Sequence, residues 1–141
     1  MLGWLDALDA AAVRPAVVQT RLHSADQAAK VTGLLLDGPE PPTAVLCFSD
    51  ATAFGVVHAA SRLGVSVPDD LSVVGFDDVP LASRMTPPLT TIRQDGAAKG
   101  RAAAAALVAA IARDRTGSDA PLEQRVLPVE LVVRASTTTA R

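Results

Sequence analysis

The chain has few of the residues that mark several familiar classes of protein. Among its 141 residues there is one cysteine, Cys47, together with two histidines, one tryptophan and no tyrosine. A single cysteine cannot form a disulfide within the chain, which fits a reducing compartment. The cysteine and the histidines show no ligand spacing, so we expect no metal and no cofactor. No apolar run approaches the ~20 residues that a membrane-spanning helix needs.

Charge of one sign is lacking as well. Thirteen basic and fifteen acidic residues give a net charge of −2, and the basic residues are scattered along the chain. This distribution excludes the electrostatic footprint of a nucleic-acid-binding surface. The apolar start of the chain has no basic leader and carries Asp6 and Asp9, which argues against a signal peptide. We therefore expect a cytoplasmic protein with no membrane partner.

What the chain does have is an alternation of helix-like and strand-like segments. We expect helices over 2–13, 24–36 and 50–63, and strands over 16–20, 43–48, 71–76 and 89–94. Such alternation predicts an α/β fold, with a parallel sheet flanked by helices. The run over 43–48 is continuously apolar, which predicts burial on both of its faces. An alanine-rich helix over 96–113, a loop over 116–121 and strands over 125–129 and 130–134 complete the chain.

Polar residues follow three of the predicted strands, at 20–24, Ser49–Asp50 and Asp77–Asp78. Ligands of open parallel sheets bind beyond the carboxyl ends of the strands, so these groups are candidate site residues. Two other interpretations stay open, because Ser49 and Asp50 are typical helix caps and the acid pair can form a turn before Pro80. Successive strand residues point to opposite sides, so at most one acid of the pair faces a given pocket. One inward carboxylate suits a ligand that bears hydroxyl groups.

An enzyme is the less favoured interpretation. Ser49, His58 and Asp77 are the residue types of a hydrolase triad, but no G-x-S-x-G motif surrounds the serine. His58 lies two turns into a helix that leads away from the strand end. A glycine-rich phosphate loop is missing too. We therefore expect no catalytic residues.

Three stretches of the sequence resemble one family. The run over 42–95, which includes V-G-F-D-D and T-P-P-L-T-T-I-R-Q, resembles the effector-binding half of LacI/GalR-type transcriptional regulators. The segments over 3–13 (GWLDALDAAAV) and 126–137 (VLPVELVVRAST) resemble the helix and the closing strand that flank it in this family. The resemblance implies a type I periplasmic-binding-protein-like fold, in which two α/β lobes are joined by crossing strands around a small effector.

The resemblance begins inside the second of the two lobes. We therefore expect residues 1–93 to form mainly that lobe, residues 94–141 to carry the crossing segment, the alanine-rich helix and the closing strands, and no DNA-binding headpiece. DNA would be contacted only through such a headpiece. The family's effector-clamping arginine would fall one residue before Met1, so we expect binding of a sugar-like effector to be weak or absent.

The resemblance also implies ligand-facing positions. Asp77 corresponds to the family's main acceptor for ligand hydroxyls, and Gln94 lies at the crossing between the lobes. Ser49 stands where many members carry asparagine. His23 stands where an aromatic ring often stacks on the ligand, although a solvated loop histidine is an equal alternative. Asp78 is then left to the turn, and Asp50 to the helix cap.

A homodimer is the last implication of the resemblance. Family members pair through the helix after the Ser-Asp pair and through the irregular segment after G-F-D-D. The corresponding positions are Phe54, Val57, His58, Leu81, Arg84 and Met85. Phe54 and Val57 can instead be core residues. We expect the alanine-rich helix, without its usual partner lobe, to dock onto another copy or to fold back onto its own sheet.

The sequence thus predicts the effector-binding and dimerisation portion of a LacI-type transcriptional regulator of sugar or related small-molecule metabolism. Two alternatives stay open: a lobe of a transporter's solute-binding protein, and a dimerisation module without a ligand. A solute-binding protein should carry a signal peptide, and the T-P-P-L-T-T-I-R-Q segment resembles the regulators rather than the transporters.

Overall fold

A computed structural model describes residues 10, 24–116 and 124–139. His23, the predicted strand over 16–20 and, apart from Ala10, the predicted helix over 2–13 lie outside the described residues. The helices and strands are α2 (Ala25–Leu36), β1 (Ala44–Leu46), α3 (Asp50–Arg62), β2 (Ser72–Asp77), β3 (Thr90–Gln94), α4 (Gly96–Thr116) and β4 (Val129–Val132), with a short 3₁₀ turn at Ala82–Arg84.

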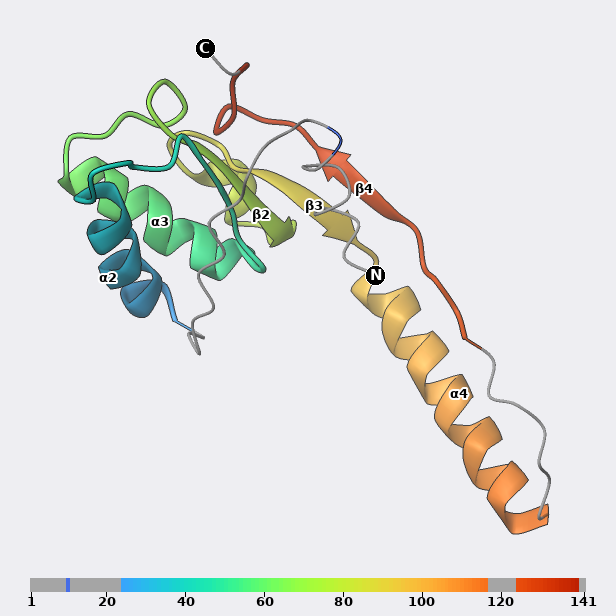
Figure 1. Ribbon diagram of the computed structural model, residues 1–141. Coiled ribbons are helices and arrows are strands. Elements are labelled where there is room, and N and C mark those ends of the chain that lie inside the picture. The colour runs from blue at the N-terminus through green and yellow to red at the C-terminus, as the bar shows by residue number, and fades with distance from the viewer. Residues whose placement is uncertain (1–9, 11–23, 117–123, 140–141) are drawn as a thin grey trace.

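The four strands form one mixed sheet in the order β1-β2-β3-β4 (Figure 1). Strands β1, β2 and β3 are parallel, and β4 runs antiparallel to β3. Asp77 pairs with Arg93 at the carboxyl end of β2, and Ile92 pairs with Leu131 on β4. The fold is therefore α/β, and the predicted parallel sheet with flanking helices is confirmed for its first three strands.

Local capping signals place the helices. Ser24 caps α2 by accepting a hydrogen bond from the Gln27 amide at 3.3 Å, and Ser49 caps α3 by accepting from the Thr52 amide at 3.2 Å. Helix α3 is followed by Gly64, whose φ of +73° lies in the left-handed region that favours glycine. The predicted starts of both helices are confirmed.

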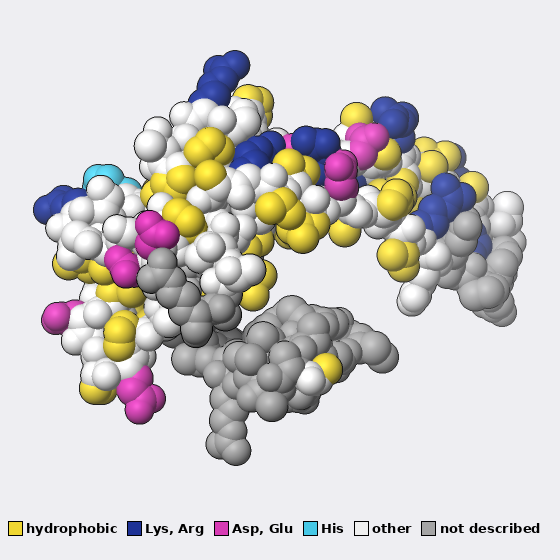
Figure 2. Space-filling view, turned by 90° about the horizontal axis from the view of Figure 1, so that it is seen from above, with side chains coloured by type: hydrophobic (Ala, Val, Ile, Leu, Met, Phe, Trp, Pro, Cys, Tyr) yellow, Lys and Arg dark blue, Asp and Glu magenta, His cyan; other side chains and the backbone are white. Residues whose placement is uncertain are grey.

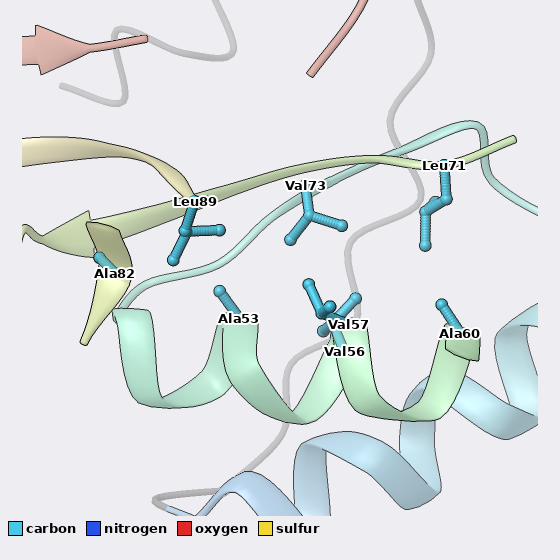
Figure 3. Packing of buried hydrophobic residues seen from close by; sticks show 8 residues of the cluster. All are labelled: Ala53, Val56, Val57, Ala60, Leu71, Val73, Ala82 and Leu89. Carbon is cyan, nitrogen blue, oxygen red and sulfur yellow. The ribbon is translucent and has the colours of Figure 1, made fainter. Parts of the chain in front are cut away.

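The core lies between α3 and the sheet. The inward face of α3 packs against β2 and the start of β3, as Figure 3 shows, and the eight buried residues are Ala53, Val56, Val57, Ala60, Leu71, Val73, Ala82 and Leu89. On its other side α3 packs closely against α2. A Cβ atom on Gly55 would collide with the Ala25 carbonyl, so this helix pair depends on a glycine there.

Helix α4 projects away from this core (Figure 1), and none of its residues is buried. Leu107, Val108 and Ile111 are 61%, 67% and 46% exposed, whereas Leu71, Val73 and Leu89 in the core are fully buried. The expectation that this helix folds back onto its own sheet is therefore wrong. Docking onto another copy stays a prediction.

Two predicted strands differ from the structure. The segment over 43–48 gives only the three residues of β1, and Leu46 and Phe48 are exposed because the described helices α2 and α3 cover one face of the sheet only. Val45 and Cys47 face the covered side and pack against the core. The segment over 125–129 is not a strand apart from its last residue, since Pro128 has no amide hydrogen to donate to a ladder.

Candidate functional site

The carboxyl ends of the three parallel strands lie along one edge of the sheet. Asp77 is the last residue of β2 and Gln94 is the last residue of β3. The Gln94 Nε2 atom donates a hydrogen bond to Asp77 Oδ1 at 2.6 Å, and Lys99 Nζ, in the first turn of α4, donates to Gln94 Oε1 at 3.2 Å. The structure thus joins two of the predicted ligand residues and adds a lysine that the sequence did not suggest.

The backbone at Asp77 and Asp78 is unusual. The φ angles are 118° for Asp77 and 55° for Asp78, both in the region that residues with a side chain rarely adopt. Aspartate tolerates this region better than most residues do. The chain therefore turns sharply at the end of β2, and the two carboxylates leave it in different surroundings.

Asp78 lies between two arginines. Its Oδ2 atom accepts from Arg93 Nε at 2.7 Å, its Oδ1 atom accepts from Arg134 Nη2 at 2.6 Å, and Arg93 Nη1 also contacts Glu130 at 3.1 Å. Burial by itself would raise the pKa of Asp78, but the hydrogen bonds and charges of Arg134 and Arg93 outweigh it and hold that pKa below its ordinary value. The turn assigned to Asp78 exists, but its carboxylate also ties the end of β2 to β3 and to the segment after β4.

Asp50 is not a helix cap, and that expectation is wrong. Its side chain is fully buried, with Oδ1 accepting from the Thr91 hydroxyl at 2.6 Å and Oδ2 accepting from the Val79 amide at 2.9 Å. The contact needs Gly75, because a Cβ atom there would collide with Asp50 Oδ1. The cap is Ser49, whose hydroxyl also lies 3.0 Å from the Thr52 hydroxyl.

The roles of two of these residues, Asp50 and Arg134, were not predicted, because their partners lie far away along the chain. Asp50 looks like a cap in its local sequence, and its partner Thr91 lies 41 positions away. Arg134 lies 56 positions from Asp78, and only its place after a strand-like run hints at a role. His23, the fourth predicted ligand residue, lies outside the described residues.

Cys47 is a poor candidate for a nucleophile. Burial, together with the nearby charge of Asp50, raises the pKa of its thiol to about 12. The thiol therefore stays protonated at neutral pH, and only the thiolate reacts readily.

The predicted interface residues fall into two groups. His58, Leu81 and Arg84 are exposed. Phe54 and Met85 are partly buried against the core. Val57 is only 7% exposed and belongs to the core itself, so its assignment to a contact surface is wrong.

Among the hollows on the surface of the described residues, two lie away from Asp77. One, of about 410 Å³, lies between α2 and α3 and is lined by Asp26, Lys30, His58 and Arg62 among others. The other, of about 380 Å³, lies beside the loop after α3, with Ser61, Ser66, Asp69 and Thr86 in its lining. Asp77 and Gln94 line neither of these two hollows.

Figure 2 shows acidic and basic side chains next to each other between the lobe and α4, with hydrophobic side chains around them. The described segments contain no group of three or more acidic, histidine or cysteine residues that could hold a metal ion. They also contain no helix that is both long enough and apolar enough to cross a membrane. What the edge offers is a carboxylate, an amide and an ammonium group, which can accept from and donate to a polyhydroxy ligand.

Comparisons with known proteins point in one direction. The sequence profile of the periplasmic binding protein-like domain matches residues 2–137. The HTH-type transcriptional repressor CytR of Escherichia coli K12 is 44% identical over 103 residues, which are 73% of this chain and 29% of the repressor. The chain therefore spans less than a third of the length of this relative.

Solved structures give the same result. The lac repressor dimer bound to operator and the anti-inducer ONPF superimposes with a TM-score of 0.80 at 33% identity, covering 97% of this chain and 46% of the repressor chain. A LacI family regulator from Lactobacillus casei with bound sucrose superimposes with a TM-score of 0.74 at 31% identity, covering 95% of this chain and 49% of that one.

Proposed function

Because the chain belongs to the family of periplasmic binding protein-like domains, in the form found in LacI-type transcriptional regulators, we propose that it is an effector-binding and dimerising part of such a regulator in the cytoplasm. Asp77 and Gln94 bind hydroxyl groups of a sugar or a related small molecule. The relatives are transcriptional regulators, which disfavours the alternatives of an enzyme and of a transporter's solute-binding lobe.

The observation that carries the proposal is the hydrogen bond between Gln94 Nε2 and Asp77 Oδ1 at the carboxyl edge of the sheet. It fixes the orientation of the carboxylate, and Asp77 Oδ2 makes no hydrogen bond within the described part of the chain. That oxygen is the acceptor for a ligand hydroxyl. Hydrogen bonds to a charged acceptor discriminate strongly against groups that cannot donate.

The proposed layout follows from the same edge. Residues 1–93 belong to the effector-binding lobe, and residues 94–141 form the crossing segment with α4 and the closing strand. In keeping with this layout, α4 leaves the lobe directly after Gln94 (Figure 1). Ser49 contributes at most a hydroxyl at the rim, because its oxygen already caps α3. We assign DNA contacts to a headpiece, which the described residues do not form.

Calorimetric titration with sucrose tests the effector role. We expect weak binding by the wild type, and a loss of about tenfold or more for Asp77→Asn and for Gln94→Leu, since hydrogen bonds to charged groups contribute about 1.5–3 kcal/mol. Glu40→Gln, an exposed acid far along the chain from the site, is the matched control and should bind as the wild type does. Equal affinity of Asp77→Asn and wild type would exclude Asp77 as the acceptor.

The dimer is the second part of the proposal. Leu81 is 52% exposed, and with the exposed Arg84 and His58 and the partly buried Met85 and Phe54 it forms the surface that we assign to the partner copy. Burial of the Leu81 side chain against a partner copy would remove apolar surface from water. Because Phe54 and Met85 also pack against the core, the sharper variants change exposed residues only.

Light scattering after size exclusion separates the two candidate contacts. We expect a wild-type dimer that Leu81→Asp with Arg84→Glu converts to a monomer, while Leu107→Asp with Ile111→Asp on α4 leaves it intact. The opposite pattern would move the contact to α4. A monomeric wild type would exclude both surfaces.

A further inference from the structure

Resting on the proposed role of Asp77 as ligand acceptor, we propose that Asp50 and Asp78 are positioning residues for it. They hold the backbone of Asp77 at a positive φ and thereby aim its carboxylate at Gln94 and at the ligand. Neither residue needs to touch the ligand itself.

The conformation of Asp77 needs such support. A φ of 118° lies outside even the small left-handed basin that non-glycine residues visit, and the adjacent Asp78 has a φ of 55°. Conformations of this kind persist only when the surrounding structure over-determines them, and they are frequent at ligand sites. The contacts that hold the backbone of Asp77 in this conformation are made by the residues that follow it, Asp78 and Val79.

The first anchor comes from α3. Asp50 accepts from the Val79 amide at 2.9 Å and from the Thr91 hydroxyl at 2.6 Å, and its side chain is fully buried. Val79 lies two positions after Asp77, so this contact fixes the end of the turn to α3 and to β3. Removal of the Asp50 carboxylate would leave the Val79 amide and the Thr91 hydroxyl without this acceptor, and an unpaired buried donor is destabilising.

The second anchor comes from β3 and the segment after β4. The guanidinium of Arg134 donates from Nη2 to Asp78 and from Nη1 to the Leu89 carbonyl at 2.7 Å, so the arginine itself has a fixed position. Arg93 holds the other carboxylate oxygen of Asp78. Asp77 lies between these anchors and the β2–β3 ladder, in which it pairs with Arg93.

If Asp78 were only a turn residue, its substitution would have a different effect. If Asp78 only served to accommodate a positive φ, glycine would replace it without loss, because glycine adopts this conformation at no steric cost. If its ion pairs hold Asp77 in place, glycine must fail as alanine does. Asp78→Gly therefore separates the two roles.

The experiment is NMR on the full chain, with sucrose as the ligand probe. The readouts that need no ligand are the Gln94 side-chain amide signal, which its hydrogen bond to Asp77 shifts and protects from exchange, and the HN–Hα coupling of Asp77, which reports φ. The variants are Asp78→Gly, Asp78→Ala and Arg134→Lys. Leu71→Ala is the control, because Leu71 is buried at the opposite end of the core from the Asp77 turn (Figure 3).

We expect all three variants to lose the protected Gln94 signal and to bind sucrose about tenfold more weakly, whereas folded Leu71→Ala keeps both. Arg134→Lys belongs with the others because an ammonium group cannot reproduce two fixed donors of a guanidinium. For Asp50, where alanine substitution threatens folding, the near-isosteric Thr91→Val removes one of its two donors, and we expect partial loss of the Gln94 signal.

A wild-type Gln94 signal in Asp78→Gly, with loss in Asp78→Ala, would overturn the inference and leave Asp78 as a turn residue. If the wild type does not bind sucrose but the amide and coupling readouts change as expected, the positioning by Asp50 and Asp78 stands and the proposed effector role fails. The two ideas are thus tested separately.

Discussion

Helices α3 and α4 are held in place by different means. Of the 13 residues of α3, seven are buried, and the helix packs between α2 and the sheet. Of the 21 residues of α4, none is buried. By sequence α4 is the stronger helix former, since it is rich in alanine.

Packing stabilises α3, whereas α4 depends on intrinsic propensity and on its ends. Asp95 accepts from the Ala98 amide at 2.8 Å at the start of α4, and Arg113 and Arg115 lie in its last turn, where positive charge favours the helix dipole. In proteins most of the stability of a helix comes from the packing of an apolar face, and no residue of α4 is buried. The contrast separates a lobe that can fold by its own contacts from a helix that needs a partner to become rigid.

The largest difference should be in amide hydrogen exchange. At concentrations where the protein is monomeric, we expect amides in α4 to open at almost no cost, and those of Val56 and Ala60 in α3 to require nearly the global unfolding free energy, a gap of roughly 5 kcal/mol or more. Exchange followed by NMR measures both helices in one sample. Equal protection of the two would mean that α4 packs on the lobe after all.

Truncation of one leucine in each region sharpens the contrast. Leu71 is fully buried and Leu107 is 61% exposed. Leu71→Ala should lower the free energy of unfolding by about 2–5 kcal/mol, because it removes transfer energy and leaves a cavity. Leu107→Ala should change it by less than about 0.5 kcal/mol. Urea unfolding monitored by circular dichroism compares them, and similar losses would break the distinction.

Glycine offers a smaller test, because each helix has one inside it. A Cβ atom on Gly55 would meet the Ala25 carbonyl and the Ala28 side chain, whereas one on Gly100 would meet nothing within 4 Å. Gly55→Ala should therefore destabilise the lobe by about 1–3 kcal/mol. Gly100→Ala should stabilise the helical state of α4 by about 1 kcal/mol. It should leave the main unfolding transition of the lobe unchanged. A stabilised lobe in Gly55→Ala would contradict the close packing of α2 and α3.

The smallest expected effect is a loss of folding stability at low pH. Because the pKa of folded Asp78 lies below its ordinary 3.8, its ion pairs stabilise the lobe at pH values above 3.8, and this stability is lost as the pH falls through the folded pKa. Asp78→Asn should remove that acid-dependent step, whereas Arg113→Gln on α4 should keep it. Thermal unfolding between pH 5 and pH 2 measures both. A step that survives in Asp78→Asn must come from another carboxylate.

The features that were predicted from the sequence are the helix caps, the helix end and the strands, which depend mainly on residues close together in the chain. Ser24 and Ser49 precede apolar helical patterns and cap helices, and Gly64 follows the end of α3. The V-G-F-D-D and T-T-I-R-Q runs became adjacent parallel strands, which brought Asp77 to Gln94. Alternation of short elements leaves few other arrangements for such a chain.

The features that were not predicted from the sequence depend on residues that are far apart in the chain. Asp50 has the sequence of a cap, and only the approach of Thr91 and of the Val79 amide makes it a buried acceptor. The apolar run over 43–48 suggested two covered faces, but coverage depends on where helices pack, so Leu46 is exposed. Val57 illustrates the same limit, since helical spacing alone cannot tell an inward face from a contact face.

Ser136 has a consequence for synthesis. Its hydroxyl accepts from the Thr90 amide at 2.8 Å and donates to the Val73 carbonyl at 2.6 Å. Ser136 therefore links β2 and β3, although it is translated after both of these strands. At ~5–20 residues per second, the 42 positions from Gln94 to Ser136 take roughly 2–8 seconds to translate. During that interval the edge of β3 lacks its antiparallel neighbour and is open to chaperones or to another nascent chain.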